Sequence, residues 1–307
     1  MTLNTKNYIA VDIAKDSLQV QAPNYACALK YDTHTLQEWI ARIPADTIIV
    51  FEATGGYERT LMQTLIDHRI AYALVGPDRV RAFAKSEGVK AKTDRIDAKM
   101  LLRFAEQKQL DPSNPPDRQR VRLVAMLDRR SHLSSMHAQE KNRRQNSTAQ
   151  IHEWIDQSID FIEWQIEQID QQIRELIDEH EVMQTQSTIL LSITGIGEVT
   201  AWSIIAYLDG IVSMKRNQMI SLAGLAPFNK DSGKSQKKRT IQGGRAKVRR
   251  VLYMAAVTAA IHNPHIKEYV EGLRSRGKPY KCAIVAAMRK LLIHAQSLLK
   301  NPENVLA

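Results

Sequence analysis

The feature that most constrains folding is a proline-rich break, Asp111-Pro112-Ser113-Asn114-Pro115-Pro116, which separates two kinds of pattern. Before the break, short apolar runs rich in β-branched residues alternate with stretches of helical spacing, and after it the spacing is helical almost throughout. Alternating strands and helices predict an α/β layer around a central sheet. Clustered proline and polar residues predict a linker, so the chain of 307 residues is expected to hold more than one domain.

The first part of the chain predicts a sheet with helices beside it. Residues 8–14 and 18–21 are apolar or alternating runs on either side of a short polar turn, which is typical of a β-hairpin. The later patterns predict, in order, a helix at 35–42, a strand at 47–52, a helix at 57–68, a strand at 71–75 and a helix at 94–107.

The middle of the chain predicts two long helices of opposite charge. Residues 117–144 are helical and basic, whereas residues 153–179 are rich in Asp and Glu. From Ile155 to Leu176, apolar residues recur at alternating steps of four and three, which is a heptad seam. The pattern predicts an antiparallel helical pair or an oligomerising coiled coil, and a bundle packed only within its own chain is the alternative.

A third region begins near Ser187, where the turn Gly195-Ile196-Gly197 separates two helical patterns. Such a turn is typical of a helix-hairpin-helix, in which backbone N–H groups at a helix N-terminus bind a phosphate. A plain packing turn between helices is the alternative. The expected domains are therefore residues 1–111, 112–185 and 186–307.

Charge and cysteine content narrow the class of protein. The chain has 43 Lys and Arg against 33 Asp and Glu, a formal net charge of +10 that favours an anionic partner. Cys27 and Cys282 are too few for a disulfide framework or a cysteine zinc site, which indicates a reducing compartment. No signal peptide is visible and no stretch approaches the roughly 18 apolar residues of a membrane span. We expect a cytoplasmic protein without a membrane partner.

Four carboxylates are candidate metal ligands. Asp12 ends the first predicted strand and Glu52 ends a later one, so both are expected at one edge of the sheet. Asp94 and Asp97 are three residues apart on a predicted helix and face the same way. Carboxylate oxygens suit Mg²⁺ or Mn²⁺, and a pair of ions stabilises the attacking and leaving oxygens of phosphoryl transfer. Each residue alone could instead be a turn residue, a surface charge or a helix cap.

Residues 214–250 form a strongly basic stretch that is opposed only by Asp231, and a phosphate backbone is the expected counterion. The candidate nucleic-acid contacts in it are Lys234, Lys237, Lys238, Arg239, Arg245, Arg249 and Arg250, in addition to Gly195 and Gly197. Ser232 could be a nucleophile in this loop, although no local triad activates it. An ordinary solvated serine is the alternative, and Ser235 is an equally plain candidate.

Several motifs in order carry a resemblance to a known family. They are Ala10-Val11-Asp12-Ile13-Ala14-Lys15, Phe51-Glu52-Ala53-Thr54-Gly55-Gly56-Tyr57, Thr93-Asp94-Arg95-Ile96-Asp97-Ala98, Thr194-Gly195-Ile196-Gly197, Gly224-Leu225-Ala226-Pro227 and Ser232-Gly233-Lys234. The chain resembles, nearly from end to end, the insertion-sequence DEDD transposases. Their better-understood members are bridge-RNA-guided serine recombinases, and the family also includes a pilin-gene DNA invertase. One departure is that Gly243-Gly244-Arg245-Ala246 replaces the more usual Gly followed by Asn or Asp.

The resemblance implies an RNase H-like N-terminal domain of the Holliday-junction-resolvase type, a coiled-coil middle and a mainly helical C-terminal transposase domain. It implies that Asp12, Glu52, Asp94 and Asp97 hold Mg²⁺ and that Ser232 becomes transiently linked to DNA, with the two domains contributed by different subunits. The implied partners are donor and target DNA, a bridge RNA and a homo-oligomer, a dimer that assembles to a tetramer. The implied setting is the bacterial cytoplasm, at the nucleoid when the protein is active.

Three other functions compete with this interpretation. A metal-dependent junction nuclease would use the acidic residues alone, without a covalent serine intermediate. A non-catalytic nucleic-acid-binding protein is disfavoured by the intact acidic quartet. Sugar kinases and actin-type ATPases share a related fold, but the sequence after Asp12 lacks their Gly-Thr phosphate loop.

Overall fold

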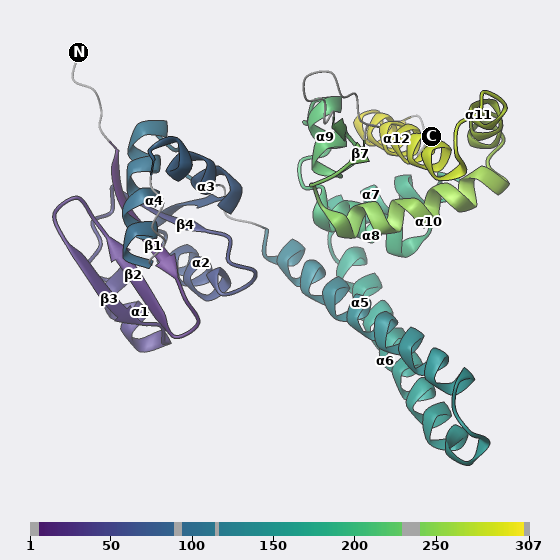
Figure 1. Cartoon of the computed structure of the whole chain (residues 1–307), viewed down its shortest axis with the longest axis horizontal. Coiled ribbons are helices and arrows are strands. Elements are labelled where there is room, and N and C mark those ends of the chain that lie inside the picture. Colours follow the sequence, from purple (N-terminus) through teal and green to yellow (C-terminus); the bar gives the residue numbers. More distant parts are fainter. Residues whose placement is uncertain (1–5, 89–93, 114–116, 229–239, 304–307) are drawn as a thin grey trace. The chain divides into compact units, whose positions relative to one another are not determined.

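The computed structural model describes residues 6–88, 94–113, 117–228 and 240–303, which belong to two compact units (Figure 1). Unit 1 extends over residues 1–115 and unit 2 over residues 116–307, so the boundary lies in the proline-rich break. Unit 1 contains a sheet with helices, and unit 2 is almost entirely helical. A further division of unit 2 near residue 185 stays a prediction.

Unit 1 is built on a five-stranded mixed sheet of order β3-β2-β1-β4-β5. The pairs β1–β2 and β2–β3 are antiparallel, which confirms the predicted hairpin, whereas β1–β4 and β4–β5 are parallel. This arrangement is compatible with the RNase H-like fold that the resemblance implies. The strands are β1 (Asn7–Ile13), β2 (Ser17–Gln21), β3 (Ala26–Lys30), β4 (Thr47–Glu52) and β5 (Ala71–Val75).

Helices cover both faces of this sheet, because each strand alternates its apolar side chains between two cores. Ile9 and Val11 pack on one face with residues of α1 (Thr33–Ile40) and α2 (Glu58–Asp67). Tyr8 and Ala10 pack on the opposite face with residues of α3 (Pro77–Ser86) and α4 (Asp94–Lys108). The predicted helices correspond to α1, α2 and α4, while β3 and α3 were not predicted.

Unit 2 begins with two long helices, α5 (Arg118–Gln145) and α6 (His152–Asp178), joined through a short 3-10 helix, Ala149–Ile151 (Figure 1). Ion pairs between them join Arg130 to Asp170 at 2.6 Å, His137 to Glu163 at 2.7 Å, and Arg144 to Asp156. Residues late in α5 thus face residues early in α6, which confirms the predicted antiparallel pair of basic and acidic helices.

The heptad seam of α6 is covered within its own chain. Ile155, Ile159 and Ile162 are at most 7% exposed, and α5 is the main partner of α6. The sequence left open whether this seam joins subunits or packs in an intramolecular bundle. In the structure α5 of the same chain covers these three residues, and a role of the seam in joining subunits stays a prediction.

The remaining helices of unit 2 share one large core, which runs from Leu123 on α5 to Leu299 near the C-terminus. They are α7 (Glu181–Leu191), α8 (Glu198–Tyr207), α9 (Arg216–Leu222), α10 (Ala246–His262), α11 (Pro264–Ser275) and α12 (Tyr280–Lys300), with a small sheet of β6 (Pro227–Phe228) and β7 (Thr240–Ile241). Contrary to the expectation from sequence, α12 is long and apolar enough to cross a membrane by length and composition alone. Half of the apolar stretch, including Ile284 and Leu291, is buried in the core of unit 2, as in the core helix of a protein without a membrane span.

Gly195 is expected to be essential for the packing of α10. It has φ +105°, and a Cβ atom there would lie 2.6 Å from the Cβ of Ala259. Gly195→Ala should therefore lower the free energy of unfolding by about 3 kcal/mol through overpacking and backbone strain. Gly272 on α11 has no atom within 4 Å of the same position, so Gly272→Ala should stabilise by about 1 kcal/mol. Urea denaturation measures both, and equal effects of the two substitutions would contradict the packing role.

Candidate active site

Asp12 and Glu52 lie at the same ends of two neighbouring strands, Asp12 one residue before the end of β1 and Glu52 at the end of β4. In the parallel pairing of β1 and β4, Val11 lies opposite Phe51, and Asp12 and Glu52 are the next residue of each strand. Both side chains are half-buried. The structure therefore places these two predicted ligands side by side on adjacent strands.

The two carboxylates also share one face of the sheet. Ala10 and Val50 pack in the core beneath α3 and α4, and side chains two residues apart on a strand point to the same face. Asp12 and Glu52 therefore lie on the face that α4 covers. Helix α4 contacts β1, β2 and β4 and carries Asp97 in its first turn, next to the buried Ala98.

The geometry given by the described residues does not complete a metal site. No group of three or more His, Cys, Asp or Glu side chains close enough to hold an ion occurs in residues 6–88, 96–113, 117–227 and 240–303. The side chain of Asp94 lies outside the described ones. Asp12 and Glu52 have the hard oxygen donors and the common placement that Mg²⁺ requires, and the participation of Asp94 and Asp97 stays a prediction.

A loop held by Glu58 follows Glu52 directly. The Glu58 carboxylate accepts hydrogen bonds from the backbone N–H of Gly56 at 2.8 Å, from the N–H of Thr54 at 3.0 Å and from the Thr54 hydroxyl at 3.1 Å. Partial burial tends to raise the pKa of the Glu58 carboxyl, but these hydrogen bonds outweigh it and lower the pKa below its ordinary value. Glu58 thus fixes the chain next to Glu52, a role that the sequence analysis missed.

Glu58→Gln is expected to loosen this loop without removing a candidate metal ligand. We expect about 1 kcal/mol less stability at neutral pH, since the amide loses the charge that strengthens the hydrogen bonds. Because folding lowers the pKa of Glu58, its contribution is present above the ordinary value of 4.5 and is lost as pH falls through the lower folded-state pKa. Urea titrations across pH test this. Glu38→Gln, at an exposed residue of α1, should leave the free energy of unfolding unchanged.

The serine candidate and part of the basic stretch lie outside the described residues. These are Ser232, Lys234, Lys237, Lys238 and Arg239. The residues that flank this segment are paired, because Pro227 lies opposite Ile241 and Phe228 opposite Thr240 in the β6–β7 sheet. The structure therefore brings the two ends of the Ser232 segment together.

Beneath this small sheet, two glycine-containing segments cross at close range. A Cβ atom on Gly244 would lie 2.3 Å from the backbone N of Gly224. The Arg249 guanidinium donates a hydrogen bond of 2.7 Å to the carbonyl of Gly243 and a longer one to Gly224. Arg249 therefore clamps the crossing, and the DNA contact proposed for it from sequence stays a prediction.

The other predicted nucleic-acid contacts have different surroundings. Arg245 precedes α10 and Arg250 is exposed on it. Gly197 is the N-cap of α8, but the next residue is Glu198, whose carboxylate is bound twice by Arg174 at 2.8 Å. These hydrogen bonds lower the pKa of the Glu198 carboxyl, so a negative charge already lies at this helix N-terminus. The phosphate contact of the Gly195–Gly197 turn stays a prediction, and the packing of Gly195 against α10 accounts for glycine there.

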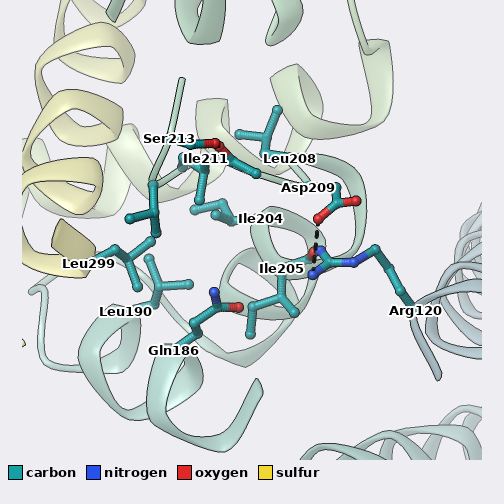
Figure 2. Close-up of a pocket in the computed structure, with 12 residues that line it drawn as sticks. Arg120, Gln186, Leu190, Ile204, Ile205, Leu208, Asp209, Ile211, Ser213 and Leu299 are labelled. Atoms are coloured by element: carbon teal, nitrogen blue, oxygen red, sulfur yellow. Dashed lines mark hydrogen bonds and ion pairs between the residues drawn. The ribbon is translucent and has the colours of Figure 1, made fainter. Parts of the chain in front are cut away.

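A hollow of about 250 Å³ in unit 2 is mainly apolar (Figure 2). Leu190, Ile204 and Leu299 line it, and Figure 2 shows Arg120 pointing toward Asp209 at its edge. The Arg120 guanidinium lies 3.2 Å from Asp209 and donates to the carbonyl of Ile205. One paired carboxylate in an apolar wall offers no set of catalytic groups, so this hollow is not the candidate active site.

Comparisons with known proteins assign the class. A family model described as "Transposase", of the IS110 DEDD group, matches residues 9–153, and a second, "Transposase IS116/IS110/IS902 family", matches residues 187–271. The chain is 28% identical to the pilin gene-inverting protein of Moraxella lacunata and 29% identical to that of Moraxella bovis, each across 96% of both chains. It is 27% identical over 135 residues to an uncharacterised IS110 insertion-element protein of Streptomyces coelicolor, which covers 43% of this chain and 32% of that protein.

These similarities define a DNA transposase or recombinase, an enzyme whose partner is DNA. The first family model spans Asp12, Glu52 and the first turn of α4, and the second spans the Ser232 segment. The chain belongs to the IS110 family of insertion-sequence transposases, which confirms the family resemblance seen in the sequence.

Proposed function

We propose that this transposase joins donor and target DNA of an insertion sequence by strand exchange, with Mg²⁺ or Mn²⁺ at its acidic residues and Ser232 as the nucleophile. The observation that carries the proposal is the placement of Asp12 and Glu52 at one sheet edge, on the face covered by α4. The DEDD family match supports a dependence on divalent metal in general terms.

In the proposed reaction, the Ser232 oxygen attacks the phosphorus of a DNA phosphodiester and the hydroxyl proton leaves to solvent or a base. The bond between phosphorus and one deoxyribose oxygen breaks, and that oxygen leaves and takes up a proton. Attack by a hydroxyl of another strand then releases the serine and restores a phosphodiester. The bound metal supplies charge stabilisation for the attacking and leaving oxygens. Asp12, Glu52, Asp94 and Asp97 would hold this metal, and the Lys and Arg side chains near Ser232 in the sequence would bind the phosphate.

The proposed partners are a bridge RNA, whose base pairing selects the DNA, and further copies of this chain, first as a dimer and then as a tetramer. Three aromatic side chains on α6 support an oligomer: Trp154, Phe161 and Trp164 are 69%, 56% and 53% exposed. Aromatic residues are enriched at protein interfaces. Gln157, Ser158 and Gln165 lie among them on the helix surface, so this face is uncharged and would not repel its copy.

The test is a plasmid that carries the gene with its natural flanking sequences, incubated with purified protein and scored for recombinant junctions. Junctions should form with Mg²⁺ or Mn²⁺ and disappear when EDTA is added. RNA that copurifies with the protein should map next to the gene. Junctions that form equally in EDTA would contradict the metal-dependent reaction.

A junction nuclease without a covalent serine intermediate is the second candidate. The placement of Asp12 and Glu52 at the same ends of adjacent strands supports this candidate, because it needs the acidic residues alone. Such an enzyme would cleave branched DNA with metal alone, and its products would carry no protein.

A further inference from the structure

A hollow of about 470 Å³ lies between α5, α8 and α10 in unit 2. Leu127, Val199 and Val251 form its apolar part, and its volume is in the range of ligand sites. The polar residues that line it are Arg130, Ser131, Ser134, Ser135, Ser203, Tyr207, Lys247 and Arg250.

Three serine hydroxyls in this hollow have no hydrogen-bond partner among the residues that the structure describes. Helical Ser and Thr commonly bond back to the carbonyl four residues earlier, as Ser158 does to Trp154 at 3.0 Å. Within the described ranges, Ser131, Ser134 and Ser203 make no such bond with their side chains. Ser203 is only 3% exposed. The Ser203 hydroxyl is not among the fully enclosed atoms without a partner, so it opens onto the hollow, where it is a donor that a ligand can bind.

The charges next to the hollow favour an anion. The carboxylates near the hollow are already paired with cations, Asp170 with Arg130, Glu198 with Arg174, and Asp128 with Lys247. Asp128 also accepts a hydrogen bond from the Tyr207 hydroxyl. Arg250 forms no ion pair among the described residues. One positive charge therefore remains beside a set of unpaired hydroxyl donors.

Helix α10 adds a second electrostatic contribution. It begins without a capping side chain and without an acidic residue in its first turn, although its N-terminus carries partial positive charge. Lys247 and Arg250, both lining the hollow, lie in its first two turns. Cations at a helix N-terminus repel the dipole, and a bound anion would relieve that repulsion.

We propose that this cleft binds a phosphate of a nucleic-acid backbone, with Ser131, Ser134 and Ser203 as hydrogen-bond donors and Arg250 as the charge. Hydroxyl and guanidinium donors around an apolar wall match a phosphodiester, which offers oxygen acceptors beside an apolar sugar. The inference rests on the proposed function for the presence of DNA or RNA, and it adds α5 and α8 to the nucleic-acid surface.

The experiment measures binding of short duplex DNA and of single-stranded RNA, both of mixed sequence, to the full chain by fluorescence anisotropy across a salt series. Arg250→Gln should flatten the log–log salt slope by about 0.9 for duplex DNA or about 0.7 for a single strand. The double variant Ser131→Ala, Ser134→Ala should weaken binding about tenfold. Alanine favours a helix at both serine positions, so the double variant should keep its fold.

The controls are Ser158→Ala, whose hydroxyl already bonds to its own helix, and Arg143→Gln, whose side chain pairs with Glu140. Weaker binding of both duplex DNA and single-stranded RNA supports a site for the phosphate backbone. Weaker binding of only one of them identifies which nucleic acid occupies the site. Unchanged slopes and affinities in Arg250→Gln and in the serine variant would overturn the inference. Failure of the proposed function is separate, because it would show as an absence of metal-dependent strand exchange in the unaltered protein.

Discussion

Asp12→Asn and Glu52→Gln are each expected to abolish strand exchange while DNA binding and folding persist. Each change removes one negative charge and keeps the shape of the side chain at the sheet edge. Loss of activity should exceed about a hundredfold, since even changes to groups around a metal ligand cost up to that much. The measurement is the yield of recombinant junctions at fixed Mg²⁺, with DNA binding followed by anisotropy.

Asp46→Asn is a matched control at the other end of β4, where Asp46 accepts a hydrogen bond from Asn7. It should recombine at the unaltered rate. Calorimetry with Mn²⁺ gives a second readout, because both active-site variants should lose heat of metal binding. Full activity in Asp12→Asn or Glu52→Gln would remove that residue from the candidate site.

Ser232→Ala is expected to eliminate a covalent protein–DNA adduct. With a nicked substrate that traps the intermediate, the unaltered protein should form an adduct, and peptide mapping should locate the DNA on Ser232. The variant should lose the adduct and all recombination, since no other group replaces an attacking oxygen, and should retain metal binding.

Ser235→Ala is the matched control, three residues away in the same basic segment. It should keep both the adduct and the recombination. An adduct on Ser235 would transfer the role to that residue. Full recombination by Ser232→Ala, with no adduct in the unaltered protein, would favour the junction nuclease.

Strands with strong apolar patterns could be predicted from the sequence, and weaker elements could not. β4 is a continuous β-branched and aromatic run, whereas β3 reads Ala-Cys-Ala-Leu-Lys and is half-exposed at the sheet edge. The helix α3 has Val80 and Phe83 as its buried residues and is otherwise mostly polar or charged, so its short sequence carries a weak signal. Burial against neighbouring elements, which a local pattern does not record, stabilises both.

The candidate site shows the same limit. The positions of Asp12 and Glu52 near strand ends sufficed to predict that they lie at the same ends of adjacent strands, because parallel strands align their ends. The support from Glu58 and the Arg249 clamp depend on backbone groups in loops, whose positions follow from tertiary packing. The seam of α6 was visible as a heptad, but spacing alone does not say whether the covering helix comes from the same chain.

The crossing of Gly224 and Gly244 holds the two ends of the intervening segment together, so the packing of the rest of unit 2 does not depend on how long that segment is. Because the crossing and the β6–β7 pair hold both ends together, the main free-energy cost of extra residues between them is the entropy of closing a longer chain. Each doubling of loop length costs only about 0.6 kcal/mol. Insertions and deletions around Ser232 should therefore change the free energy of unfolding little. The length of this segment can differ among relatives while α9 and α10 keep their packing.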